Sequence, residues 1–288
     1  MVWMVAAVFS AVFAGLTAIL SKCGVKHTNS DVATAVRTSV VLAFAWAIVL
    51  LADARETLSE IDGRSLTFLL LSGVATGASW ICYFKALSLG DVSKVAAVDK
   101  SSVVFSVLFA ILFLGERTLW GWKLVCLALI AAGTYLMTDR RRGGEAKNWL
   151  WLVFSLLSAL FAAATSILAK IGIENVDSNA ATAIRTCVVF GMAWLIVLCR
   201  GEVKFVKKLK GRELCFLVLS GIATGASWLC YYFAIQNGQV SVVVPIDKMS
   251  ILITVLFSLF VLGEQLSKRA VCGLCLMLAG TLAMAIWT

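Results

Sequence analysis

The stretch SGVATGASWICY, from Ser72 to Tyr83, returns almost unchanged as SGIATGASWLCY, from Ser220 to Tyr231. Adding 148 to a residue number converts the first copy into the second. The same offset relates ATAVRT, which ends at Thr38, to ATAIRT later in the chain. Because the offset holds over roughly a hundred residues, the chain is interpreted as an internal duplication.

Composition indicates the solvent in which these repeats fold. Of the 288 residues, 61% are hydrophobic and 14% are charged, whereas a soluble domain is about half apolar and about a quarter charged. About 20 apolar residues are needed to cross the ~30 Å hydrocarbon core of a bilayer. We therefore predict an all-α integral membrane protein with ten transmembrane helices, at residues 2–22, 32–52, 65–87, 93–114, 120–138, 149–171, 180–199, 213–235, 240–262 and 269–287.

The ten predicted spans divide into two five-helix repeats, residues 1–140 and 148–288. Five is an odd number, so the second repeat is expected to enter the membrane from the opposite side. Such inverted repeats are typical of secondary transporters, which place a binding site near the midplane between the two repeats.

Shorter motifs at equivalent places strengthen this interpretation. The fourth and ninth spans end in Leu114-Gly115-Glu116 and Leu262-Gly263-Glu264, and the fifth and tenth contain Gly133-Thr134 and Gly280-Thr281. With this order and spacing, the chain resembles the drug/metabolite transporter superfamily, in its EamA-like family, over essentially its whole length. The resemblance implies transport, including export of amino acids and related metabolites, and does not name a substrate. Some relatives are single five-helix units that pair in opposite orientations, and the near-identity of the two halves resembles a fusion of such a unit.

The distribution of charge argues against several other classes. The net charge is +9, but the Lys and Arg residues lie mostly in short loops, as membrane orientation requires, so no nucleic-acid partner is expected. One histidine, His27, and nine scattered cysteines provide no zinc-ligand spacing, and neither a metal nor a cofactor is expected. A lipid-processing membrane enzyme would need clustered acids or histidine bases. The protein is therefore not expected to be an enzyme, and a channel is kept as a less favoured alternative.

The basic residues also predict an orientation. Thirteen of them lie in the loops after spans 1, 5, 7 and 9, and four lie in the remaining loops. By the positive-inside rule the first side is cytoplasmic, which puts both termini outside, although many relatives are drawn with both termini inside. The expected location is the plasma membrane of a prokaryote, as a multi-pass monomer or homodimer.

Two pairs of ionisable residues lie deep in predicted spans. Asp99 and Lys100 are about seven residues into the fourth span, ~10 Å below its start, and Asp247 and Lys248 repeat this in the ninth span. Because charged groups in a bilayer are costly and usually functional, we expect both pairs to bind substrate. Each Lys would hold an anionic group, and each Asp would hold an amine or exchange a proton as the coupling ion. Alternatively, the pairs are salt bridges that only hold helices together.

Helix geometry guides the expected pairing. Neighbouring residues point ~100° apart around a helix, so we do not expect either Asp to pair with its own Lys. A cross-pairing, Asp99 with Lys248 and Asp247 with Lys100, is the alternative. Pro245, where the first repeat has Ala97, is expected to break its helix and free carbonyl groups near the midplane.

Aromatic residues follow the small-residue runs. Trp80 and Tyr83, and their counterparts Trp228 and Tyr231, are three residues apart and share a helix face. We expect them to form an aromatic wall that contacts substrate, with simple packing or an interfacial belt as the alternative.

Basic and acidic residues near the span ends are candidate gates. Arg37 and Arg185 begin the second turns of their helices and are expected at the mouths of two cavities, with substrate-binding roles; Lys22 and Lys170 are weaker candidates. The alternative is snorkelling to the headgroups. Glu116 and Glu264 end helices, where a negative charge needs a compensating partner such as Arg117, Lys123 or Arg269.

Together these features predict a secondary active transporter of a small polar metabolite, an amino acid or related zwitterion or anion, exported by alternating access. The alternative is an exporter of cationic or amphipathic drugs. The first span has no carboxylate of the kind found in small multidrug transporters, and the deep acids are matched by lysines. Both features favour zwitterionic or anionic substrates.

Overall fold

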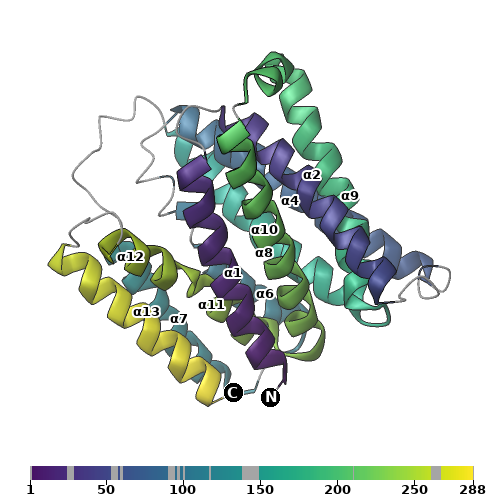
Figure 1. Ribbon diagram of the computed structural model, residues 1–288. Helices are drawn as coiled ribbons and strands as arrows, with labels where there is room; N and C mark the ends of the chain where they lie inside the picture. The colour runs from purple at the N-terminus through teal and green to yellow at the C-terminus, as the bar shows by residue number, and fades with distance from the viewer. Residues whose placement is uncertain are drawn as a thin grey trace.

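The computed structural model describes residues 2–24, 29–52, 58, 61–89, 95, 98–99, 101–116, 118–137, 149–209, 211–260 and 267–287. Within these ranges the regular secondary structure is entirely helical (Figure 1). The helices of the first repeat are α1 (Val2–Gly24), α2 (Ser30–Leu51), α4 (Gly63–Leu89), α6 (Ser102–Phe113) and α7 (Trp120–Met137). The second repeat contains α8 (Leu150–Ile173), α9 (Ser178–Cys199), the 3₁₀ helix η1 (Glu202–Lys208), α10 (Gly211–Asn237), α11 (Val240–Lys248), α12 (Ser250–Phe260) and α13 (Lys268–Ile286).

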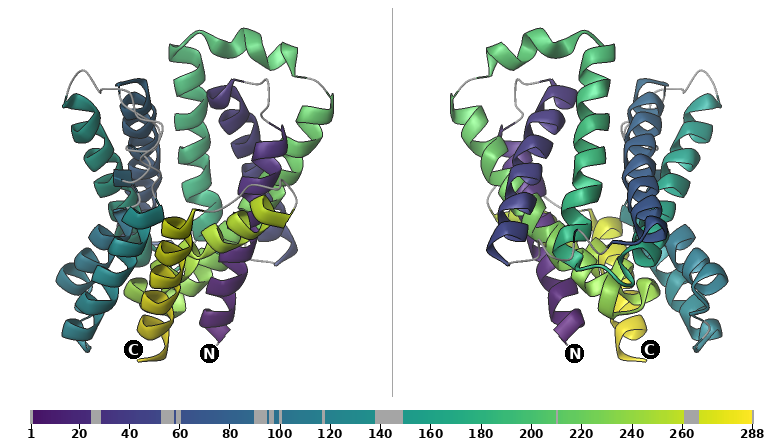
Figure 2. Two further views of the ribbon diagram at one scale, coloured as in Figure 1. Left: turned by 90° about the vertical axis from the view of Figure 1, so that its left-hand side faces the viewer. Right: turned by 90° about the vertical axis from the view of Figure 1, so that its right-hand side faces the viewer.

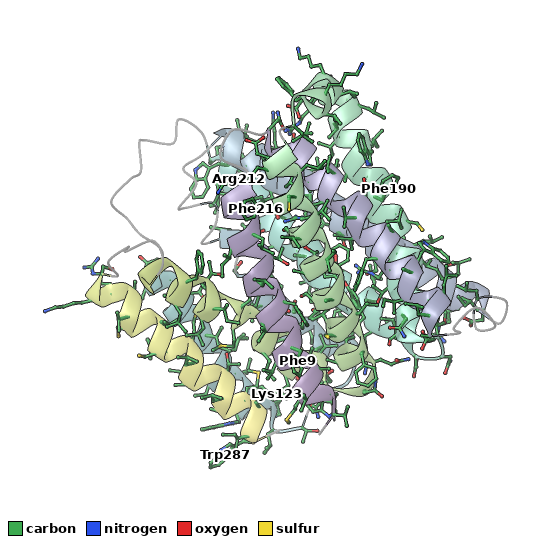
Figure 3. The ribbon with its side chains drawn as sticks, in the orientation of Figure 1. Phe9, Lys123, Phe190, Arg212, Phe216 and Trp287 are labelled. Atoms are coloured by element: carbon green, nitrogen blue, oxygen red, sulfur yellow. The ribbon has the colours of Figure 1, made fainter. Side chains whose placement is uncertain are left out.

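The structure confirms a multi-pass membrane protein. Eight helical segments of the described chain are long and apolar enough to cross a bilayer, and α6 and residues 120–136 of α7 form two shorter apolar helices. Large apolar side chains cover the outside of the bundle, among them Phe9 and Trp287 (Figure 3). Alanine, serine, threonine and glycine occupy much of the interior, as expected where lipid solvates the outer surface and small residues let helices approach. The count of ten transmembrane helices stays a prediction.

The two repeats contact each other through equivalent helices. The first helix of each repeat packs on the third helix of the other, so that α1 lies against α10 and α8 lies against α4. The second helices, α2 and α9, pack together, as do the fifth helices, α7 and α13. Both chain termini lie at the same end of the bundle (Figures 1 and 2). The duplication in the sequence is therefore also a duplication of contacts.

The glycines of the repeated motif form two further contacts between the repeats, α4 with α9 and α10 with α2. A Cβ atom on Gly73 would lie 2.7 Å from Cβ of Val188, and one on Gly77 would lie 2.7 Å from Cβ of Met192, so only glycine lets α4 approach α9 this closely. In the second copy, Gly221 and Gly225 approach Val40 and Phe44 of α2 in the same way.

The serines and threonines of the motif form the other face. Ser72 Oγ donates a hydrogen bond to the carbonyl of Thr165 (2.8 Å), and Thr76 Oγ1 lies 3.3 Å from Thr165 Oγ1, which joins α4 to α8. Between α10 and α1, Ser220 bonds to the carbonyl of Thr17, and Thr224 lies 3.3 Å from Thr17 Oγ1. One twelve-residue stretch, repeated in each half of the chain, thus fixes two helix–helix interfaces.

The glycine–threonine motifs explain the contact between α7 and α13. A Cβ atom on Gly133 would lie 2.5 Å from the carbonyl oxygen of Gly273, and one on Gly280 would lie 2.8 Å from that of Cys126. Because both obstacles are backbone atoms, the two helices could accept a larger residue only by separating.

A break interrupts the fourth helix of each repeat at the same position. In the second repeat α11 ends at Lys248 and α12 begins at Ser250, and the N–H of Met249 donates to the carbonyl of Ile246 (2.9 Å). In the first repeat Ser101 N–H donates to the carbonyl of Val98 (3.0 Å) immediately before α6. Since only the second repeat has a proline nearby, Pro245 cannot be the common cause of the break. The expected break is present, but it follows Pro245 by several residues.

Short polar side chains begin several helices. Asn29 Oδ1 accepts from the N–H of Asp31 at the start of α2, and Asp177 Oδ1 accepts from Asn179 N–H at the start of α9. Asp62 accepts from Ser65 N–H before α4 (2.7 Å), and hydrogen bonds from Ser65 hold the pKa of Asp62 below its ordinary value.

Candidate functional site

Asp247 is held by serines from two other helices. Ser10 Oγ of α1 donates a hydrogen bond to Asp247 Oδ1 (2.6 Å) and lies 3.3 Å from Ser227 Oγ of α10. Ser227 Oγ in turn donates to the carbonyl of Ser10 (3.1 Å). The Asp247 side chain is 17% exposed and lies directly before the helix break.

Asp99 has the same environment in the first repeat. Ser158 Oγ of α8 donates to Asp99 Oδ1 (2.7 Å) and lies 3.2 Å from Ser79 Oγ of α4. We name the two groups the serine–aspartate triads: Ser10, Ser227 and Asp247, and Ser158, Ser79 and Asp99. Each triad combines both repeats, since its acid and first-helix serine come from different halves of the chain.

The lysines differ from the prediction. Lys248 Nζ lies 4.0 Å from Asp247 Oδ2, so the expectation that this acid would not contact its own neighbour was wrong. The Lys248 side chain is long and flexible, and although it is 45% exposed it comes within ion-pair distance of the neighbouring carboxylate. No ion pair joins Asp99 to Lys248 among the described residues. Lys100, and with it the second expected cross-pair, lies outside the described residues.

The predicted aromatic wall is divided between two places. Tyr231 lies in the interior, where its hydroxyl is 2.8 Å from Ser166 Oγ and its ring packs edge-on against Tyr232 (5.1 Å between centroids). Tyr231 also packs against the apolar cluster that contains Ile246, the residue before Asp247, and Tyr83 is half-buried on α4. Trp80 instead packs beside α2 and α9, near Asp31.

Arg185 is buried rather than located at a cavity mouth. Only 1% of the residue is exposed, and its guanidinium lies between α4, α9 and α10. Nε donates to Ser72 Oγ (3.2 Å) and Nη2 donates to Thr76 Oγ1 (3.1 Å). Cζ lies 4.1 Å from the ring centroid of Tyr232 and 5.8 Å from that of Trp228.

The counterpart of Arg185 has a different exposure. Arg37 is half-buried on α2, where the helix packs against α10. The sequence places the two arginines at equivalent positions, but only the tertiary structure shows that the second is enclosed.

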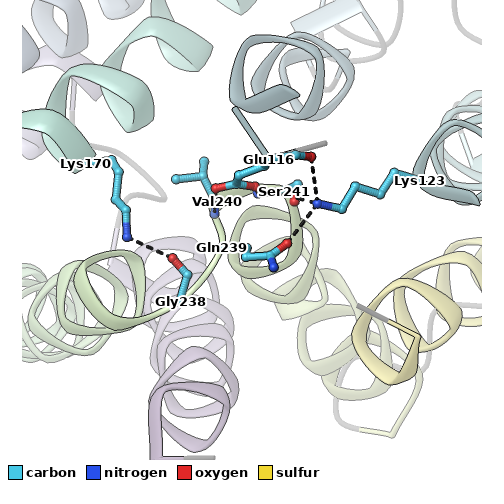
Figure 4. Close-up of polar contacts among 7 residues, drawn as sticks. All are labelled: Glu116, Lys123, Lys170, Gly238, Gln239, Val240 and Ser241. Atoms are coloured by element: carbon cyan, nitrogen blue, oxygen red, sulfur yellow. Dashed lines mark hydrogen bonds and ion pairs between the residues drawn. The ribbon is translucent and has the colours of Figure 1, made fainter. Parts of the chain in front are cut away.

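Glu116 is the centre of a polar network at the end of the bundle where α6 meets α11 (Figure 4). Its carboxylate accepts hydrogen bonds from the backbone N–H groups of Val240 (2.7 Å) and Ser241 (3.0 Å) at the start of α11. Lys123 Nζ donates to Gln239 Oε1 (2.8 Å) and to the Glu116 carbonyl (3.1 Å), and lies 4.0 Å from the carboxylate. Lys123 is 0% exposed.

This network confirms one expectation about the acids that end helices. Glu116 has Lys123 as a compensating partner, and it also stabilises the positive end of α11. Glu264 and Arg117 lie outside the described residues. Gln239 was not predicted from the sequence, because glutamine is not one of the residue types that ordinarily cap a helix N-terminus.

Lys170 is a helix cap rather than a residue that snorkels to lipid headgroups. Its Nζ donates to the carbonyls of Ile235 (2.6 Å), Gln236 (2.9 Å) and Gly238 (3.0 Å) at the end of α10. A cation at this position stabilises the negative end of the helix. The side chain of Lys22, its counterpart, lies outside the described residues.

An ion pair joins the start of α2 to the end of α9. Arg200, the C-terminal cap of α9, donates from Nη1 to Asp31 Oδ2 in the first turn of α2. The repeat offset places Ala52 and Asn179 at the equivalent positions. This latch of Asp31 and Arg200 therefore exists at one end of the α2–α9 pair and has no charged counterpart at the other.

Known proteins resemble this chain in sequence and in fold. The model of the EamA-like transporter family matches residues 1–139 and again residues 149–286. A Sinorhizobium protein named "Uncharacterized transporter in cobO 3'region" is 49% identical over 136 residues, which are 47% of this chain and 95% of that protein. One solved crystal structure superposes with a TM-score of 0.79 over 97% of this chain and 95% of that chain, at 19% sequence identity, and so shares the fold.

The Sinorhizobium relative has the length of a single repeat, whereas this chain contains two. The two family matches coincide with the two halves found in the sequence and leave only a short connection between them. The chain therefore belongs to the EamA-like transporter family, and it is a multi-pass membrane transporter of the drug/metabolite type rather than an enzyme.

Proposed function

We propose that this protein is a secondary active transporter of a small polar metabolite, an amino acid or a related zwitterion or anion, that works by alternating access. The observation that carries this proposal is the pair of serine–aspartate triads at equivalent helix breaks. Carboxylates inside a membrane domain are costly and usually mark the path of a substrate or coupling ion.

The hydrogen bonds of the two acids suit them to exchange. Asp99 and Asp247 accept from serine hydroxyls, and neither forms a described ion pair with an arginine. A hydroxyl group can both donate to a carboxylate and accept from its protonated form. We propose that the two acids bind a proton or a substrate amine in alternation with Lys248 and Lys100, the lysines beside them.

The symmetric contacts support alternating access. Because α1 packs on α10 and α8 packs on α4, the same interfaces recur on two sides of the bundle. We propose ten membrane-spanning helices in two inverted repeats. Ten crossings would put both termini on one side, in agreement with their position at one end of the bundle. Opening one set of interfaces while the other closes would expose the triads to each side in turn.

The triads also support a functional monomer, because a single chain provides all six residues. A relative of single-repeat length would need two copies to assemble the same pair. Export across a prokaryotic plasma membrane is proposed from the family resemblance.

Counterflow in proteoliposomes tests the function. Purified protein is reconstituted with an unlabelled amino acid or organic acid inside, and uptake of the labelled solute is measured. Saturable counterflow is expected, with a loss of about tenfold or more in Asp99→Asn and Asp247→Asn. Asp177→Asn is the matched control, because asparagine also caps a helix N-terminus and should leave transport unchanged.

The outcomes separate the alternatives. Full counterflow in both Asp99→Asn and Asp247→Asn would show that the two acids have only a structural role. Wild-type protein that exchanges only lipophilic cations would favour the drug-exporter alternative. Flux that rises without saturation would favour a channel.

A further inference from the structure

Arg185 is a buried cation without an acidic partner in the described chain. The residue is 1% exposed, and no described carboxylate forms an ion pair with it. Its Nη1 atom is buried and has no hydrogen-bond partner among the described residues. Arginine remains charged in proteins, and an uncompensated buried charge is strongly destabilising. An anion bound at this guanidinium would therefore stabilise the protein.

The surroundings of Arg185 fix its orientation. Ser72 and Thr76 of α4 occupy Nε and Nη2, and the ring of Tyr232 covers the guanidinium at 4.1 Å. These contacts leave Nη1 as the donor still available. A guanidinium held in one orientation loses little entropy when it binds a carboxylate, which makes the group well suited to recognition.

We propose that Arg185 Nη1 binds the carboxylate of the transported solute. This inference rests on the proposed transport function and names the chemical group that the site selects. Tyr232 contacts the Arg185 guanidinium, and Tyr231 packs edge-on against Tyr232 and against the apolar cluster that contains Ile246, the residue before Asp247. A zwitterion would have its carboxylate on Arg185 and its amine directed toward Asp247.

The residues around the equivalent arginine of the first repeat differ in sequence. Arg37 occupies the equivalent position, but the pair Tyr231-Tyr232 corresponds to Tyr83-Phe84 in the first repeat. The aromatic partner at 4.1 Å from Arg185 is thus a phenylalanine in the other half, without a hydroxyl group. We place the anion at Arg185 because it is the more enclosed of the two arginines.

The test compares acids with their amides. The probes are labelled alanine, phenylalanine, glutamine and lactate, each matched by its carboxamide, which keeps the size but lacks the negative charge. Wild-type proteoliposomes should exchange at least one acid at least about tenfold better than its amide. Arg185→Gln should reduce this preference to about threefold or less, and Arg185→Lys should retain part of it. Arg212→Gln, at the exposed start of α10 (Figure 3), is the control.

A second measurement needs no variant. The midpoint of thermal unfolding of the wild-type protein in detergent should rise with the transported acid and not with its amide. This measurement keeps the inference testable if Arg185→Gln does not fold.

The results distinguish this inference from the proposed function. Equal transport and equal stabilisation by acid and amide would overturn the anchor and leave the transporter proposal standing. An acid preference that survives in folded Arg185→Gln would also overturn it. If wild-type protein exchanges none of the probes and no other polar solute, the proposed function fails and the anchor fails with it.

Discussion

At the scale of single residues, serine hydroxyls hold the two deep acids in place. Ser10 and Ser158 each donate one short hydrogen bond to an aspartate that the other repeat provides in the equivalent position. A hydrogen bond from a hydroxyl to a carboxylate contributes a net ~1.5–3 kcal/mol, which is small enough for the contact to break and reform. Such contacts suit acids that change partners during a transport cycle.

We predict that Ser10→Ala lowers counterflow severalfold while lowering the free energy of unfolding by ~2 kcal/mol. The substitution removes a hydrogen bond to Asp247 and leaves the packing of α1 nearly unchanged. Transport assays and thermal unfolding of the same preparation measure the two effects. Ser155→Ala is the control, because among the described residues this buried hydroxyl bonds only to Trp151 of its own helix. Equal transport losses in both variants would contradict the triad role.

At the scale of helices, close backbone approach and end-capping determine how the elements fit. Gly133 and Gly280 let α7 and α13 meet backbone to backbone, and Glu116 joins the end of α6 to the start of α11. These contacts lie away from the triads, so we assign them to stability and to the positioning of helix ends.

We expect Gly133→Ala to destabilise the protein. Its new Cβ atom would lie 2.5 Å from the carbonyl of Gly273, so α7 and α13 would have to separate. Gly191→Ala is the matched control, because a Cβ atom there meets nothing within 4 Å and alanine favours a helix by ~1 kcal/mol. Thermal unfolding in detergent should show a lower midpoint for Gly133→Ala and an unchanged or higher one for Gly191→Ala.

We expect Glu116→Gln to lower the free energy of unfolding by about 3 kcal/mol, because it leaves Lys123 buried without a negative partner. The double variant Glu116→Gln/Lys123→Met should recover part of this loss, since it removes both charges. Chemical denaturation of the three proteins measures the coupling. Additive losses in the double variant would show that the two residues act independently.

At the scale of the whole molecule, the two repeats are nearly equivalent but their ends are not. The latch of Asp31 and Arg200 closes one end of the α2–α9 pair, where the opposite end has Asn179 and Ala52. A transporter held by an ion pair at one end should favour the conformation in which that end is closed, because opening that end would break the ion pair.

We predict that each single charge reversal, Asp31→Arg or Arg200→Asp, lowers the counterflow rate by placing like charges at the latch. The double reversal should restore much of the rate, because it rebuilds the pair with opposite polarity. Arg269→Asp, at an exposed position of α13, is the control for a simple change in net charge. Single reversals as active as the wild type would exclude a role of the latch in the cycle.

The sequence by itself determined the class of the protein, its two repeats and the positions of the acids. Hydropathy, the constant offset and the motifs at helix ends are local patterns, and the family matches agree with them. Asp99 and Asp247 could be selected as site candidates because a charged residue in an apolar span is conspicuous wherever it points.

Only the tertiary structure decided which side chains meet. Ser10 bonds to a residue 237 positions away, Arg185 bonds to one 113 positions away, and Lys123 bonds to one 116 positions away. A periodic pattern gives the face of a helix but not the helix that packs against it. The burial of Arg185 and the exposure of Lys248 therefore followed from how the repeats interlock, because each repeat completes its polar contacts with helices of the other.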